Sequence, residues 1–260
     1  MSDALLLSID EYCALQRQPA HAHDALHLSL IVRGTVTESV GAHTTSGRPF
    51  SVVCKDAGVR HANAWGPSGA TLVRLSLDGG TLGALLGLPD ASVDAWRWRE
   101  TPMVARAFLA VLARSPAHGA RVRTDDVLLT ELLAALTVTG HGAKGVPPAW
   151  LRLVVARARE EWHPSLTGST LAREAGVHSV YLARCLRRWY GVGLAELLRI
   201  ERARRAGAMA VTQEASLSRV AHTLGFSDEA HQCRSLRSTL GISPGRLRAL
   251  LRTARTSRLQ

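Results

Sequence analysis

The chain has 260 residues, 46% of them hydrophobic, and a formal net charge of +11 at pH 7. This length favours two domains of ordinary size over a single one. No segment approaches the ~18 uninterrupted apolar residues that cross a bilayer, and the first residues lack the basic region and the cleavage site of a secretory signal. We therefore expect a cytoplasmic protein without a membrane partner.

The excess positive charge lies in one half of the chain. Residues 149–260 hold 19 arginines and 8 acidic residues, whereas residues 1–148 hold 13 basic and 13 acidic residues. Clustered arginines neutralise phosphates and release the counterions bound to them. A codon bias toward arginine does not explain such an asymmetry. The C-terminal half is therefore predicted to bind a polyanion.

The N-terminal part has the pattern of a β-rich domain followed by helices. Short segments that are β-branched or alternate in polarity, separated by Gly, Pro and Ser, predict antiparallel strands. Apolar residues recur at spacings of three and four from Thr81 to Thr139, which predicts two or three helices. The predicted strands are Leu26–Val32, Thr35–Val40, Phe50–Cys54 and Ala70–Leu77.

The segment GHGAKGVPP, residues 140–148, combines glycines with a double proline, which interrupts helices and strands alike. The step in charge occurs at the same place. We therefore predict an α+β protein of two domains joined by a linker at 140–148. Residues 1–139 would form a small β-barrel (about 1–80) with appended helices (about 81–139), and residues 149–260 an all-α domain.

Two segments of the C-terminal half resemble each other: LAREAGVHSVYLARCLRRWYG (171–191) and VAHTLGFSDEAHQCRSLRSTLG (220–241). Each has an alanine four residues before a glycine and then a polar helix that ends at another glycine. The small residue lets two helices cross closely, and the glycine supplies the left-handed backbone that ends the first helix, as in a helix-turn-helix. The turn and packing residues are Ala172, Gly176, Ala221 and Gly225.

A long helix, Leu194–Val211, is predicted between the two units. It would hold two reading helices so that they enter successive major grooves, ~34 Å apart. In the second unit Ser227 is predicted to cap the reading helix, whose first residues Asp228 and Glu229 suit the positive end of the helix macrodipole.

Residues from about Trp150 to Arg252 resemble the DNA-binding domain of AraC-type (arabinose-regulator) proteins. The resemblance is carried by the LAREAGV opening, the ERARR of the connecting helix, the GFSDEAH start of the second unit and the closing GISPGRLR. It implies a transcription regulator that binds double-stranded DNA and, if it activates, contacts RNA polymerase. The base-reading positions that it implies are Val180, Ala183 and Arg184, and Glu229, Ala230, His231 and Arg234.

The residue types agree with these roles. Arg184 and Arg234 can each bind guanine bidentately, which is worth ~1 to 3 kcal/mol of discrimination. Glu229 could accept from a cytosine amino group, or it could simply be a solvated carboxylate at the helix N-terminus. Phosphate contacts are assigned to Arg187, Arg188 and Arg237.

The chain departs from the family pattern at three positions. His178 replaces a usual capping serine, Gly193 replaces the Ser or Thr that caps the connecting helix, and Gln232 replaces a phenylalanine that packs. Each departure is predicted to weaken a cap or a core contact by ~1 kcal/mol.

Four histidines of the N-terminal domain, His21, His23, His27 and His61, form a further candidate site. Their spacing resembles the cupin pattern, in which histidines and an acid converge inside a small β-barrel, and His27 stands in the place of the acid. Imidazoles are good ligands for zinc, iron or nickel. Alternatively, the histidines line a pocket by hydrogen bonding and bind no metal.

We therefore predict a transcription regulator, not an enzyme, with a cupin-like N-terminal domain that senses a small-molecule or metal effector or mediates homodimerisation. The helices between Thr81 and Thr139 would make the dimer contacts, and the two domains would shift across the 140–148 linker. Two alternatives stay open: a metal-dependent cupin enzyme fused to a DNA-binding domain, and a nonspecific nucleic-acid-binding protein.

Overall fold

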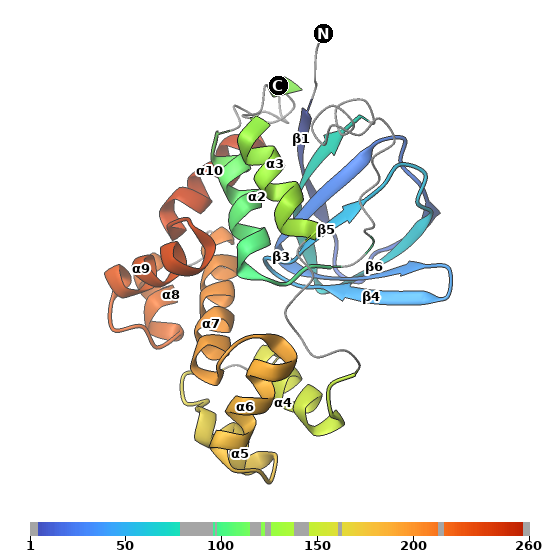
Figure 1. Cartoon of the computed structure of the whole chain (residues 1–260). Coiled ribbons are helices and arrows are strands. Elements are labelled where there is room, and N and C mark those ends of the chain that lie inside the picture. The colour runs from blue at the N-terminus through green and yellow to red at the C-terminus, as the bar shows by residue number, and fades with distance from the viewer. Residues whose placement is uncertain are drawn as a thin grey trace.

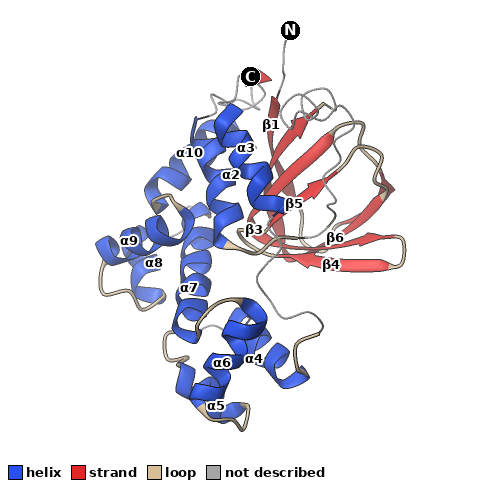
Figure 2. Cartoon of the chain, viewed as in Figure 1, coloured by secondary structure: helices blue, strands red, loops and turns tan. Residues whose placement is uncertain are grey.

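The computed structural model describes residues 5–78, 96, 98–114, 121–122, 126–137, 146–160, 163–212 and 216–256. The N-terminal part forms an antiparallel sheet, and the helices lie along one side of it and below it (Figures 1 and 2). The predicted fold class, a β-domain with appended helices and an all-α part with two helix-turn-helix units joined by a long helix, is confirmed. Residues 79–95 and 138–145, on which the start of the predicted helical segment and most of the predicted linker fall, lie outside the described residues.

The two longest strands, β3 and β6, pair with each other and are shared by both halves of the sheet. In one half β5 pairs with β3, and β1 pairs with β6 and with β7; in the other half β4 pairs with β3 and β2 with β6. The strands are β1 (Leu5–Tyr12), β2 (Arg17–His21), β3 (Leu26–Val40), β4 (His43–Gly47), β5 (Val52–Lys55), β6 (His61–Leu77) and β7 (Arg121–Val122).

A glycine marks the place where β3 passes from one half of the sheet to the other. Gly34 has φ +78°, and a Cβ atom there would lie 1.9 Å from the carbonyl oxygen of Gly69. Only glycine fits so close a backbone approach. The register between β3 and β6 also shifts on both sides of Gly34. The two strands predicted over 26–32 and 35–40 are therefore one strand, bent at this residue.

Four strands were absent from the sequence prediction: β1, β2, β4 and the two-residue β7, which lies in the segment predicted to be helical. β2 and β4 are mostly exposed, so they carry no alternation of apolar and polar residues. β1 does alternate, with Leu5, Leu7 and Ile9 buried, and this pattern was available in the sequence.

Two helices follow the sheet and seven form the C-terminal part, among the described residues. The first two are α2 (Pro102–Arg114) and α3 (Asp126–Thr137). The C-terminal helices are α4 (Ala149–Glu160), α5 (Gly168–Glu174), α6 (Ser179–Tyr190), α7 (Leu194–Val211), α8 (Leu217–Thr223), α9 (Glu229–Leu240) and α10 (Pro244–Thr256).

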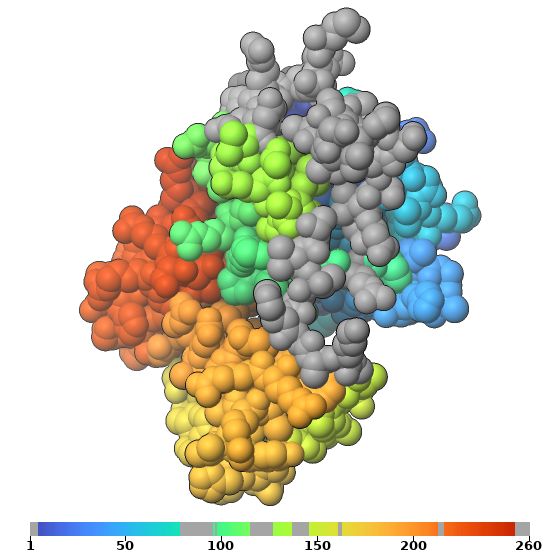
Figure 3. Space-filling view, viewed as in Figure 1, coloured from blue at the N-terminus to red at the C-terminus, as the bar shows by residue number. Residues whose placement is uncertain are grey.

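The hydrophobic cores do not divide the molecule at the point where the charge changes. One core joins the sheet, α2, α3, the C-terminal half of α7 and the second helix-turn-helix unit; Leu28, Phe108, Ala206 and Leu236 all belong to it. The first unit, α4 to α6, has a separate core with the start of α7. In the space-filling view this unit, yellow and orange, forms a lobe of its own (Figure 3). The predicted domain boundary stays a prediction.

Candidate nucleic-acid interface and histidine cluster

The first helix-turn-helix unit has the geometry that its sequence predicts. Ala172 is buried, and Gly176 has φ +66° just after α5 ends. The reading helix α6 begins after His178, whose Nδ1 accepts a hydrogen bond from the amide of Val180 at 3.3 Å. The helix ends at Gly191, which has φ +71°. The histidine thus replaces the expected serine as a cap acceptor.

The second unit repeats this geometry with one correction. Ala221 is buried and Gly225 has φ +67°. The cap of the reading helix α9 is Asp228, not Ser227 as predicted: its Oδ1 accepts from the amide of His231 at 2.5 Å. Asp228 still has extended backbone, so the helix starts one residue later than predicted and its carboxylate is the group that reaches the free amide. That hydrogen bond is the main reason why the pKa of Asp228 is lowered.

The predicted DNA contacts lie on the outer faces of α6 and α9. Both reading helices have 12 residues between a cap and a left-handed glycine, so their positions correspond one to one. Arg184 and Arg234 occupy the same sixth position, and both are exposed. Of the remaining predicted contacts, Val180, Arg187, Arg188, Glu229, Ala230 and Arg237 are exposed, and Ala183 and His231 are partly exposed.

Aligning the two units by their caps adds a residue that the sequence analysis missed. Tyr181 stands at the third position of α6, where α9 has His231, and 46% of its surface is exposed. Its ring stacks on Trp150 with centroids 5.8 Å apart. The ring of His231 is also held, because its Nδ1 lies 3.1 Å from the hydroxyl of Ser227 and its edge contacts Phe226. Both third-position rings are thus fixed by their own unit.

The ERARR segment of α7 ties the connecting helix to the sheet on one of its faces. The carboxylate of Glu201 accepts two hydrogen bonds from Arg48, one of them 2.8 Å long. The guanidinium of Arg204, which is 2% exposed, donates to the carbonyl oxygens of Pro49 at 2.8 Å and of Glu100. These side chains therefore hold α7 against the segment between β4 and β5 and against Glu100 before α2.

The two other arginines of that segment hold the two helix-turn-helix units. Arg202 donates to the carbonyl of Leu224 at 2.8 Å, in the turn of the second unit, and its guanidinium lies 4.4 Å from the ring centre of Phe226. Arg205 donates to the carbonyl of Glu160 at 2.7 Å and to that of Arg159 at 2.9 Å, at the end of α4. These arginines belong to the positively charged half of the chain, but they form contacts within the protein.

An ion-pair network continues from Arg48 between the sheet and the C-terminal part. Arg48 and Arg159 both contact a carboxylate oxygen of Glu100, at 3.2 Å and 2.7 Å. Burial favours the neutral acid, but attraction from the two arginines outweighs it and lowers the pKa of Glu100. The network borders a cavity of about 1070 Å³ between the β3–β4 hairpin, α4 and α7.

The structure brings the four predicted histidines together at one end of β2, β3 and β6. Ring nitrogens of His21, His23 and His61 lie within 4.8 Å of one another. The ring of His27 contacts that of His23, with centroids 4.1 Å apart, but His27 does not belong to the set of three. His27 is 8% exposed and its Nδ1 has no hydrogen-bond partner.

Backbone carbonyls orient two of these rings. Nδ1 of His21 lies 2.8 Å from the carbonyl oxygen of Pro19, and Nδ1 of His61 lies 2.9 Å from that of Val59. A carbonyl requires the proton on Nδ1, which leaves the lone pair on Nε2 of each ring. Burial is the largest cause that lowers the pKa of His23 to about 4 and that of His27 to about 3, so both are neutral at pH 7.

A buried pair beside the histidines was not predicted from the sequence. Nζ of Lys55 lies 2.6 Å from Oε1 of Glu38 and 3.2 Å from Nε2 of His61. Glu38 also accepts from the indole of Trp96 at 2.9 Å. The ammonium of Lys55 therefore competes with any metal ion for the lone pair of His61.

The comparisons with known proteins bear on the C-terminal part. Residues 171–250 match the family model of a helix-turn-helix domain. A search of curated protein sequences gives no match. Among the described residues no helix is long and apolar enough to cross a bilayer.

Three solved structures illustrate what the chain is similar to. ToxT from Vibrio cholerae is 10% identical over 95% of this chain and 98% of its own, with a TM-score of 0.39. The DNA-binding domain of AdpA, in complex with a target DNA, is 29% identical over 43% of this chain and 98% of its own, with a TM-score of 0.38. A cupin superfamily protein from Desulfitobacterium hafniense is 19% identical over 30% of this chain and 71% of its own, with a TM-score of 0.27.

These TM-scores lie below 0.5, so the likenesses by themselves argue for no function. The family match and the duplicated geometry agree with each other, however, because both cover α5 to α10. Over residues 171–250 the chain therefore carries an AraC-type helix-turn-helix domain.

Proposed function

We propose that this protein is a sequence-specific DNA-binding transcription regulator and not an enzyme. One observation carries the proposal: two helix-turn-helix units with matching caps each expose an arginine at the sixth position of the reading helix, Arg184 in α6 and Arg234 in α9. An arginine on the outer face of a reading helix can bind the two acceptors of a guanine edge in the major groove.

The roles of the other exposed residues follow from their place on the same helices. Arg187 and Arg237, one turn beyond the reading arginines, are assigned to phosphates, as is Arg188. Phosphate contacts fix the position of the protein on the duplex, and base contacts select the sequence. The glycine caps and buried alanines hold the reading helices at a fixed angle within each unit.

The test is selection of duplexes from a random library by the full-length protein, followed by binding to the selected site. Arg234→Ala is expected to relax base preference at one position by about tenfold, since one bidentate pair is worth about 1 to 3 kcal/mol. Arg237→Ala is the matched control and should weaken all sequences alike. If a randomised duplex competes as well as the selected one, the protein binds nucleic acid without specificity and the proposal fails.

We further propose that the N-terminal domain senses an effector or mediates dimerisation. Two observations support this proposal. The Arg48–Glu201 contact gives the sheet a direct connection to α7, the helix that carries both reading units. Met103 on α2 and Val127 on α3 are exposed apolar side chains, as a face between two copies would require. Light scattering of the wild type and of a Met103→Glu, Val127→Glu variant tests the dimer, which should be lost in the variant.

A metal ion is the effector that the histidine cluster favours. His21, His23 and His61 would hold it through ring nitrogens, which suit zinc, iron or nickel. Elemental analysis of protein purified without chelator is expected to give about one equivalent of metal, lost in a His21→Ala, His23→Ala variant. Protein without metal would leave the histidines as the lining of a pocket, in which Lys55 holds His61.

A further inference from the structure

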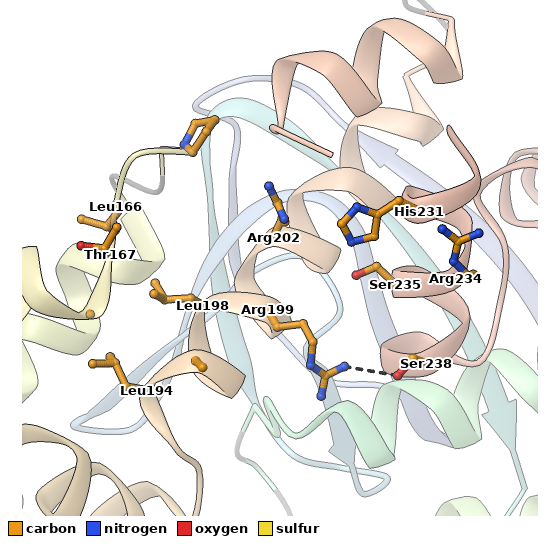
Figure 4. A pocket seen from close by; sticks show the side chains of 13 residues that line it. Leu166, Thr167, Leu194, Leu198, Arg199, Arg202, His231, Arg234, Ser235 and Ser238 are labelled. Carbon is orange, nitrogen blue, oxygen red and sulfur yellow. Dashed lines mark hydrogen bonds between the residues drawn. The ribbon is translucent and has the colours of Figure 1, made fainter. Parts of the chain in front are cut away.

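A groove of about 830 Å³ separates the two helix-turn-helix units on the side of the reading helix α9 (Figure 4). It is formed by the start of α5, the first half of α7 and the outer face of α9. His231 and Arg234, which are predicted to read bases, form part of its wall. The groove is therefore continuous with the proposed DNA-binding face.

The two walls of the groove differ in chemistry. Arg199, Arg202, His231 and Arg234 lie on the α7 and α9 side, and among the described residues that line the groove none is acidic. The other side, formed by the segment before α5 and the first residue of α7, carries the apolar side chains of Leu166 and Leu194 and the hydroxyl of Thr167 (Figure 4). A positive wall facing an apolar one suits the phosphates and the sugars of a single nucleic-acid strand.

Arg199 is fixed in a position from which it can serve such a strand. Its Nη1 donates to the hydroxyls of Thr239 at 3.0 Å and Ser238 at 3.3 Å, so the side chain reaches from α7 to α9 (Figure 4). Its ion pair with Glu196, at 3.7 Å, is exposed, and such a pair contributes little. Its two hydroxyl partners are neutral, so they do not offset the positive charge of the guanidinium.

We propose that this groove binds the phosphate backbone of the DNA between the two segments that α6 and α9 read. The inference rests on the proposed function and adds a contact to it: if α9 lies in a major groove, the strand bordering that groove passes over Arg199. This contact supplies affinity that does not depend on sequence, and it sets the distance between the two segments that are read.

The experiment uses the full-length protein and a duplex selected as described above. Ethylation interference on the wild type is expected to show sensitive phosphates between the two read segments, and Arg199→Ala should lose these alone. The affinity of this variant near 0.1 M salt should fall about fivefold to tenfold on every sequence, and the slope of log K against log salt should decrease by about 0.9, as for one phosphate contact.

Two further variants test the role of charge in the groove and provide a control outside it. Ser235→Glu places a negative charge in the groove while Arg199 and its hydrogen bonds stay in place, and it should weaken binding more than Arg199→Ala. Arg60→Ala removes an exposed arginine before β6, far along the chain from the groove, and should leave the affinity and the slope unchanged.

The outcomes separate this inference from the proposed function. If both groove variants keep the salt slope and the interference pattern of the wild type, the groove does not bind the DNA backbone. If Arg234→Ala still relaxes base preference in that case, the proposed function stands without the groove. Groove variants that bind DNA normally but fail to activate transcription would instead point to a protein partner and would also overturn it. If the wild type shows no preference among duplexes, both the groove proposal and the proposed function fail.

Discussion

The two helix-turn-helix units have the same local structure but different support. α6 and α9 have the same length, a side-chain cap at the start and a left-handed glycine at the end. The second unit shares its core with the sheet and α2, whereas the first has a small core of its own. α7 spans both cores. The difference shows that a duplicated sequence unit need not be a duplicated structural unit, and that the second reading helix is coupled to the N-terminal domain more directly than the first.

The largest expected loss of stability comes from breaking the ion pair that connects α7 with the sheet domain. Glu201→Gln removes the charge that faces Arg48 in a buried pair, and the free energy of unfolding should fall by about 3 kcal/mol. The matched control is Glu174→Gln in the first unit, whose pair with Arg157 is exposed and worth at most about 1 kcal/mol. Urea denaturation measures both, and equal losses would mean that the two units are supported alike.

The contact between Gly207 of α7 and Phe50 is expected to give the next largest effect. A Cβ at Gly207 would lie 2.6 Å from the buried Phe50 ring, whose residue has φ +61°, so Gly207→Ala should cost about 1 to 2 kcal/mol despite the better helix propensity of alanine. Gly168→Ala is the control in the first unit, because there the Cβ meets only the partly buried aliphatic side chain of Leu194 and no aromatic ring. Thermal unfolding should separate the two variants, and an equally stable Gly207→Ala would contradict the tight packing.

Replacing the buried amide of Gln232 should increase stability, in contrast to the two substitutions above. Gln232 is fully buried and both of its side-chain polar atoms lack a hydrogen-bond partner, whereas Leu182 occupies the same fourth position of α6. Gln232→Leu should therefore raise the free energy of unfolding by about 1 kcal/mol, since it removes an unsatisfied polar group. The reciprocal change, Leu182→Gln, should destabilise the first unit. A Gln232→Leu protein less stable than the wild type would show that the amide has a partner in solution.

Lowering the pH should destabilise the core of the sheet and the second unit before that of the first unit, without any substitution. Burial, with Arg74, His23, Lys55 and His61 nearby, lowers the pKa of His27 from 6.5 to about 3 in the folded protein. The unfolded chain therefore binds a proton more readily, so the stability that neutral His27 contributes is complete above pH 6.5 and is lost as the pH falls toward 3. Amide hydrogen exchange near pH 5 should show the sheet and the second unit weakening together while α6 stays protected.

His27→Gln provides the control for this pH dependence, because an amide does not titrate. The variant should show a smaller loss of stability between pH 7 and pH 5 than the wild type. If α6 loses protection at the same pH as α9, the two cores unfold as one and the comparison between the units is wrong.

Much of the C-terminal part could be predicted because its signals are local. The positions of Gly176 and Gly225 and of the buried alanines follow from spacing within about one helix-turn-helix, where backbone geometry allows few alternatives. The one local error, Ser227 in place of Asp228 as the cap, concerned two adjacent residues that can both accept a hydrogen bond from a free amide. The sheet was predicted less completely, since the exposed strands β2 and β4 have no apolar alternation.

By itself the sequence determined two reading helices, the glycines at which they end, and the half of the chain that carries the excess positive charge. Only the tertiary structure decided which arginines remain exposed on the outer face and which form hydrogen bonds and ion pairs within the protein. Arg48 and Glu201 are 153 residues apart, and Arg204 and Pro49 are 155 apart. The same holds for the second unit joining the core of the sheet and for the buried pair of Lys55 and Glu38, which are 17 residues apart. A charged side chain has the same local pattern whether it faces solvent or a buried partner, because its partner is chosen by packing between distant segments and not by its neighbours in the chain.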